Sequence, residues 1–202
     1  MRHGQERRSL LTGALALLAG ACVAVSMGGC GAPRASGPYS TQSADARDPR
    51  KADELNARAA DVIDRDPEQA EALLREALTA DIYHGPAHNN LGTLYLAQGK
   101  LYEAASEFEW ARKLLPGHPD PRMNLALTLE SAGRTDEALA TYETALEVYP
   151  QHLPSMQALA RLRVRSGMTG DRTRELLQQV AFKSEDAQWR DWARMQLAKE
   201  DL

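Results

Sequence analysis

Residues 85–118, GPAHNNLGTLYLAQGKLYEAASEFEWARKLLPGH, align without a gap with residues 119–152, PDPRMNLALTLESAGRTDEALATYETALEVYPQH. The matching positions carry identical, small or aromatic residues in both copies: Leu91 with Leu125, Gly92 with Ala126, Gly99 with Gly133, Ala104 with Ala138, Phe108 with Tyr142, Ala111 with Ala145 and Pro116 with Pro150. A fixed period of 34 residues predicts a fold built by stacking copies of one small unit, because a single unit cannot bury its own apolar face.

Each copy has the pattern of two helices joined by a tight turn. Apolar residues in 101–115 recur at steps of three and four residues, as on one face of an amphipathic helix. Gly99 and Gly133 are placed to end the preceding helix in a left-handed conformation. Pro116 and Pro150 stop the second helix of each copy. The pattern therefore predicts an all-α fold.

The marker positions resemble those of the tetratricopeptide repeat, although His88 and Arg122 stand where that family has an early Trp. The resemblance implies a helix-turn-helix solenoid of about three and a half repeats. We expect the array to span residues 51–202, with units 51–84, 85–118, 119–152 and 153–184 and a capping helix in 185–202. The match weakens in the last unit, where Arg172 stands at a position that should hold Ala.

The expected capping helix is rich in aromatic side chains. Trp189 and Trp192 lie at helical spacing after a good helix start at Ser184. An aromatic stripe at this spacing indicates packing against the last open face of the array. The alternative is that the two Trp side chains form a binding site for a ligand.

The first fifty residues have the features of a signal peptide followed by a flexible linker. A basic start precedes 10–27, which carries no charge, as in a secretory signal peptide covering 1–29. The sequence Met27-Gly28-Gly29-Cys30 resembles a bacterial lipobox, which implies a lipidated Cys30 and attachment to a membrane of the cell envelope. Alternatives are an uncleaved anchor helix, ordinary cleavage, or acylation at Cys22; export by the general or the twin-arginine route stays open. Residues 30–50 are then the lipidated Cys and a flexible linker.

Composition and motifs exclude several classes of protein. With 24 basic and 28 acidic residues the formal net charge is −4, which argues against nucleic acid as the main partner. Both cysteines lie in the first thirty residues, so no disulfide framework or cysteine metal site is expected downstream. No phosphate loop, nucleophile elbow or other catalytic motif occurs, and we expect neither an enzyme nor a cofactor.

Two groups of polar residues are interpreted as structural. His84, His118 and His152 are 34 residues apart, which places them in successive repeats, too far apart to converge on one metal ion. A metal between His84 and His88 is disfavoured because Gly85-Pro86 should break the helix between them. Carboxylates such as Glu107 are expected on outward-facing second helices, so no acid–base pair is predicted.

The remaining candidate is a binding groove. The family resemblance implies that first helices line a concave surface, on which an early Asn bonds the backbone of a bound peptide. The candidate groove residues share this face: Asn56, Asn89, Asn90, Thr93, Met123, Asn124, Leu127, Arg161 and Arg165. The Asn residues could instead cap or pack locally. We expect a protein or peptide partner, bound as an extended segment or helix; the alternative is an envelope accessory module that binds cell-wall glycan or assists an enzyme in trans.

Overall fold

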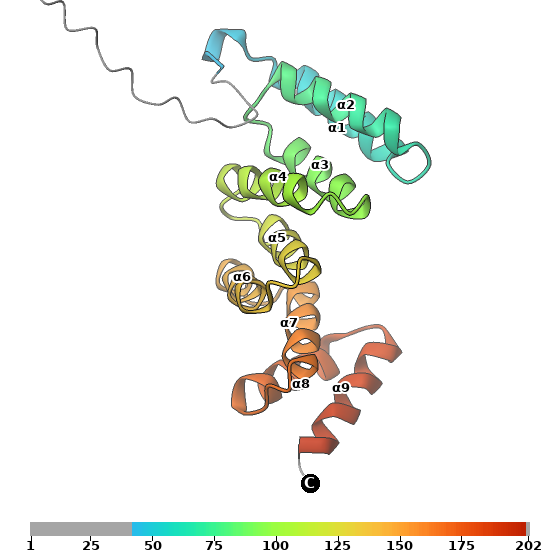
Figure 1. The fold of residues 1–202 in the computed structure, drawn as a ribbon, viewed down its shortest axis with the longest axis vertical. Coiled ribbons are helices and arrows are strands. Elements are labelled where there is room, and N and C mark those ends of the chain that lie inside the picture. Colours follow the sequence, from blue (N-terminus) through green and yellow to red (C-terminus); the bar gives the residue numbers. More distant parts are fainter. Residues whose placement is uncertain (1–41, 201–202) are drawn as a thin grey trace, which may run out of the picture. The chain divides into compact units, whose positions relative to one another are not determined.

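A computed structural model of the chain describes residues 42–200, which lie within one compact unit. This range is helical throughout, without a strand (Figure 1). Its elements are the 3₁₀ turn Ala44–Ala46 and the helices α1 Pro49–Val62, α2 Pro67–Ala80, α3 Gly85–Ala97, α4 Leu101–Leu114, α5 Asp120–Ser131, α6 Thr135–Val148, α7 Leu153–Arg165, α8 Asp171–Lys183 and α9 Ala187–Glu200. The expected signal peptide and Cys30 lie outside the described residues. Among the described helices, none has the length and apolar character that a membrane crossing requires.

The helices begin and end at residues whose chemistry favours those positions. The carboxylate of Asp48 accepts a hydrogen bond from Lys51 N at the start of α1. The backbone of Gly99, Gly133 and Gly167 has φ of 73°, 75° and 69°, a region that a residue without Cβ adopts at little cost. These three positions follow α3, α5 and α7, which confirms the helix ends predicted at Gly99 and Gly133.

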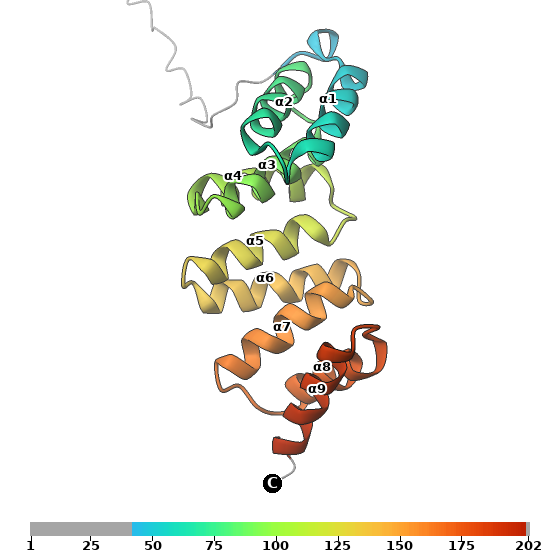
Figure 2. The ribbon, with the colours of Figure 1, turned by 90° about the vertical axis from the view of Figure 1, so that its right-hand side faces the viewer.

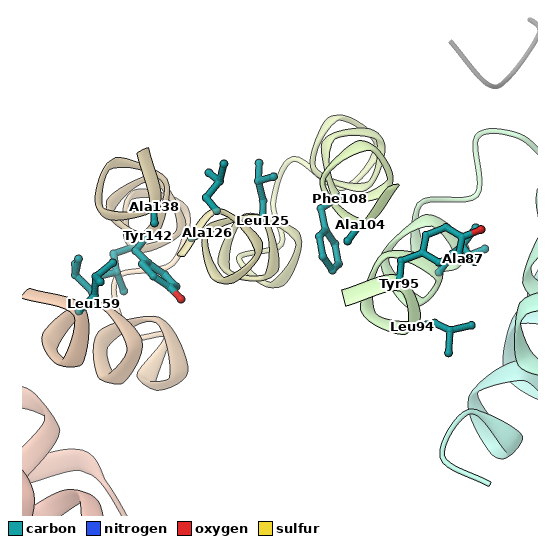
Figure 3. Packing of buried hydrophobic residues seen from close by; sticks show 14 of the residues in the cluster. Ala87, Leu94, Tyr95, Ala104, Phe108, Leu125, Ala126, Ala138, Tyr142 and Leu159 are labelled. Carbon is teal, nitrogen blue, oxygen red and sulfur yellow. The ribbon is translucent and has the colours of Figure 1, made fainter. Parts of the chain in front are cut away.

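The core between paired helices combines small residues on one helix with a ring on the other (Figure 3). Phe108 of α4 is fully buried against Gly92 of α3, where an added Cβ would lie 2.7 Å from the ring carbon Cε1. Ala126 and Tyr142 hold the matching positions in α5 and α6, and both are 0% exposed. The small residues let the helices approach closely enough to bury a whole ring between them.

Helices in contact are neighbours along the chain. Each helix from α1 to α8 packs on the next, and α9 packs on α8 (Figures 1 and 2). The first helices also contact one another in sequence, α1 with α3, α3 with α5 and α5 with α7. This pattern of contacts is that of a helical-repeat solenoid, in which each unit supplies half of its neighbour's core.

The last helix pair keeps the repeat pattern after a shift of one residue. Thr173, Leu177 and Val180 of α8 are all 0% exposed and have the same spacing as Ala104, Phe108 and Ala111 of α4. The turn 166–170 between α7 and α8 is two residues longer than the turns 98–100 and 132–134, and the buried positions of α8 are shifted by one residue. The alignment without a gap, which sets Arg172 at the position of the small core residue, is therefore out of register by one residue here, since Thr173 takes that place.

The end of the expected linker packs on the array. The side-chain amide of Gln42 donates to Thr79 O at 3.1 Å and accepts from Ile82 N at 3.1 Å. Arg47 forms a two-bond ion pair with Asp81, at 2.7 and 2.9 Å. Helix α1 begins at Pro49, two residues before the array was expected to start. The part of 30–50 that the structure describes is thus fixed to α2 by hydrogen bonds.

Candidate functional site

A hollow on the first-helix side of the array lies between α5, α7 and α9, and we call it the groove. One pocket of about 190 Å³ has a mostly apolar floor with one amide and one guanidinium, formed by Met123, Leu127, Tyr142, Pro154, Gln157, Ala158, Arg161 and Trp189. A second pocket of about 290 Å³ is lined by Arg161, Gln188, Trp189 and Trp192. The two pockets share Arg161 and Trp189, so they form one continuous surface.

The aromatic part of the groove comes from α9. The rings of Trp189 and Trp192 pack edge to face, with centroids 5.4 Å apart and planes at 86°. Both side chains pack partly on the core, while Ala193 between α9 and the array is fully buried. The two Trp residues remain half-buried and line a pocket. Helix α9 therefore covers the end of the array. Its two Trp residues also line a pocket, as the alternative of a ligand site at these residues would require.

The basic residues of the groove are held by one buried carboxylate. Oε1 of Glu130 lies 2.9 Å from Nη2 of Arg165 and 3.4 Å from Nη2 of Arg161. Oε2 of Glu130 accepts a hydrogen bond from the Tyr142 hydroxyl at 3.0 Å. Burial, reinforced by the Glu130 charge, raises the pKa of Tyr142, so this hydroxyl keeps its proton and stays a donor. The arrangement fixes the two guanidinium groups at the rim of the groove.

The four asparagines of the candidate site pair with one another across successive repeats. Asn90 Nδ2 donates to Asn56 Oδ1 at 2.9 Å, and Asn124 Nδ2 donates to Asn89 Oδ1 at 3.1 Å. Thr93 is exposed, and its hydroxyl donates to the Asn89 carbonyl. These bonds join α1 to α3 and α3 to α5. They correspond to the alternative in which the Asn side chains pack locally. In each of these side chains the bond uses one of the two polar atoms of the amide, either Nδ2 or Oδ1.

Of the nine candidate groove residues, Met123, Leu127 and Arg161 line the hollow directly. Arg165 contacts it through Glu130. Asn56, Asn89, Asn90 and Thr93 lie on α1 and α3, and Asn124 follows Met123 on α5 but does not line either pocket. Arg163, which lies between Arg161 and Arg165 on α7, donates to Thr173 Oγ1 of α8 at 2.9 Å.

One prediction about the second helices is wrong. Glu107 of α4 is 4% exposed, and its Oε2 lies 2.6 Å from Nδ1 of His88. Nε2 of His88 lies 2.8 Å from the Ile82 carbonyl oxygen, and the imidazole stacks on Trp110 with centroids 5.5 Å apart. His88 thus occupies the position where the family has Trp, and Glu107 turns inward to pair with it. A histidine–carboxylate pair does exist, but His88 is 0% exposed and has no access to a substrate.

Two other histidines lie at the starts of helices, and the side chain of His84 caps its helix. His84 Nδ1 accepts from Ala87 N at 3.0 Å at the start of α3, and its Nε2 lies 2.9 Å from Asp53 Oδ1. His152 Nε2 lies 3.1 Å from Asp120 Oδ1. Gly85 and Pro86 are the first two residues of α3, after His84. The expectation that they break a helix is therefore wrong. Within 42–200, no three His, Cys, Asp or Glu side chains come together as a metal site would need.

Sequence reasoning missed Gln188 and Pro154, which lie on α9 and α7 and line the groove. No local signal marks them, since their exposure depends on how α9 is rotated against α7. Trp189 and Trp192 were visible as an aromatic pair, but spacing alone does not distinguish a buried stripe from one that is half exposed.

The fold and groove define a helical-repeat solenoid, and comparison with known families identifies its kind. Two family models described as tetratricopeptide repeat match residues 60–119 and 95–162. Together they cover just over half of the chain, which belongs to the tetratricopeptide-repeat family.

Individual relatives show the same fold. The chain is 24% identical over 98 residues to Tetratricopeptide repeat protein 8 of Mus musculus, and spans only 19% of that protein's length. A tetratricopeptide repeat protein from Parabacteroides merdae superposes with a TM-score of 0.62 at 23% identity, covering 75% of this chain and 60% of that one. The first such domain of Spaghetti (RPAP3), bound to an HSP90 peptide, gives a TM-score of 0.57 at 19% identity, covering 60% of this chain and 98% of the domain.

Proposed function

We propose that the array is a protein-interaction module that binds a segment of a partner protein in the groove between α5, α7 and α9. The observation that carries the proposal is the composition of the groove. It exposes Met123, Leu127 and Trp189 beside the amides of Gln157 and Gln188. Apolar side chains supply binding energy by burial, and amides bond to a peptide backbone.

Peptide binding in this fold has a precedent in the Spaghetti domain, which was solved with a bound HSP90 peptide. A cell-wall glycan is a weaker fit, because sugar rings stack on a flat aromatic face. Trp189 and Trp192 pack edge to face, so each ring covers part of the other. The groove is therefore better suited to side chains that insert between the rings and the aliphatic residues of α5 and α7.

We further propose that Cys30 carries a lipid and tethers the array to a membrane of the bacterial envelope, where it acts in scaffolding or assembly. The support is the lipobox-like sequence before Cys30. Since Gln42 is already bonded to α2, the free tether is at most residues 31–41. Eleven extended residues reach about 40 Å, which limits how far the α1–α2 end of the array can lie from the membrane.

The groove is tested by photo-crosslinking in cells that express the full chain. A photoreactive phenylalanine analogue replaces Gln188 in the groove or, as a control, Phe182 on α8, whose side chain is 86% exposed. We expect a discrete partner adduct from position 188 and none from position 182. Adducts from position 182 alone would refute the groove as the binding surface.

The tether is tested separately by Cys30→Ser, with Cys22→Ser as the matched control. We expect the Cys30 variant to accumulate as an uncut precursor without lipid, and the Cys22 variant to mature normally. Intact-mass analysis measures both. A mature chain that starts at a residue other than Cys30 would contradict the lipid anchor.

A further inference from the structure

We propose that the groove recognises a partner segment in which one acidic side chain lies between two apolar side chains, and that α9 is part of this binding site. The inference rests on the proposed function and adds the chemistry of the partner. It is carried by the charge at the rim, the division of the groove into two pockets, and the exposure of the α9 rings.

The charge at the rim is positive. Arg161 and Arg165 share a single carboxylate, Glu130, so one positive charge is in excess. The Glu130 side chain is 7% exposed, whereas those of Arg161 and Arg165 are 44% and 58% exposed. A partner approaching the groove therefore meets guanidinium groups. A carboxylate is their natural counterpart, because guanidinium donors match its geometry.

The two pockets meet at Arg161. Met123 and Leu127 line only the first pocket and Trp192 lines only the second, whereas Trp189, like Arg161, lines both. A segment that fills both pockets with apolar side chains passes Arg161 between them. The acidic group of the partner is thus expected inside the segment, flanked by apolar residues on both sides.

Helix α9 packs on the array through one face, on which Trp189, Trp192 and Ala193 lie at helical spacing. Ala193 is fully buried on the face that closes the array. Trp189 and Trp192 are only partly buried and line the groove together with the exposed Gln188. A helix that served only as a cap would gain more by burying both rings, since each carries a large apolar surface. The exposed part of the rings is available to a partner.

The test uses amidated, fluorescein-labelled peptides in which a central Glu is separated from a Phe on each side by zero to three Ser residues. Fluorescence anisotropy measures their binding to the full chain in mild detergent. We expect at least one peptide to bind saturably and its Glu→Gln counterpart to bind about tenfold more weakly. The difference should shrink in about 1 M salt, which screens exposed charges.

Three variants of the chain locate the interaction. Arg165→Gln should weaken binding of the Glu peptide several-fold and leave the Gln peptide unchanged. Arg194→Gln removes an equal charge from α9 outside the groove, where Arg194 lies 3.7 Å from Asp191, and should change neither affinity. Glu130→Gln should strengthen binding of the Glu peptide, because it raises the excess charge. Strengthening cannot result from partial unfolding, so this variant keeps the test decisive.

Two results would overturn the inference. If the Glu and Gln peptides bind equally, or if none binds, the proposed partner chemistry is wrong, while a crosslink from position 188 would leave the proposed function standing. If the full chain self-associates in sedimentation velocity and Trp192→Ala abolishes this, the occupant is a second copy of the chain. Loss of the crosslink itself refutes the function, so the two failures are distinguishable.

Discussion

The contact between Gly92 and Phe108 gives the sharpest prediction about stability. In Gly92→Ala the new Cβ would lie 2.7, 2.8 and 3.0 Å from three carbons of the Phe108 ring. Carbon atoms prefer a separation of about 3.5–4.0 Å, so the ring must move by most of an ångström. It has no room to do so because Phe108 is 0% exposed. Overpacking of this kind costs about 1–3 kcal/mol.

The substitution also has a favourable effect, since Ala is better than Gly inside a helix by about 1 kcal/mol. We expect the clash to win, with a net loss of up to about 2 kcal/mol in the free energy of unfolding. Urea denaturation followed by circular dichroism measures this loss. The matched control is the same substitution in a Phe108→Leu background, where no ring opposes Cβ and Gly92→Ala should be neutral or stabilising. A single variant as stable as the natural chain would refute the close-packing argument.

Two further predictions concern polar contacts at helix ends. Because His84 Nδ1 accepts from Ala87 N, His84→Ala should lower the free energy of unfolding by about 1 kcal/mol and His84→Asn by less, since Asn is a good helix cap; urea denaturation compares them. The hydrogen bond from Arg47 lowers the pKa of Asp81 below its ordinary 3.8, so the pair stabilises the fold above that pH and the stabilisation is lost as pH falls through the lower pKa. Asp81→Asn should therefore reduce stability at neutral pH and flatten the acid limb of a stability–pH curve; an unchanged acid limb would contradict the assignment.

The helix pairs and their order could be predicted from the sequence because the signals are local. A left-handed glycine such as Gly99 ends a helix through the backbone of its own turn. The three- and four-residue spacing of apolar residues marks the buried face of a helix whatever packs against it. The period of 34 then repeats these signals, so a small residue facing a ring in one unit predicts the same in the next.

The register of the last pair could not be predicted by the same means. An alignment without gaps places Arg172 in the core, whereas the longer turn after α7 shifts Thr173 into that position. A turn accepts an extra residue at little cost, because its backbone is exposed to solvent. Only the packing of α8 on α7 fixes which residue of the helix faces inward.

The chemistry of the groove and of the buried polar pairs depends on residues that are distant in sequence. Glu107 pairs with His88 across 19 residues, and Glu130 holds Arg161 across 31. Whether a carboxylate on a helix faces water or a partner depends on how the neighbouring helix is placed and rotated, and a repeat period does not specify this for charged side chains. The sequence by itself therefore determined the repeats, their caps and the residue types on the first-helix face. The tertiary structure decided which of those side chains pair with each other, and that the rings of α9 form one wall of the groove.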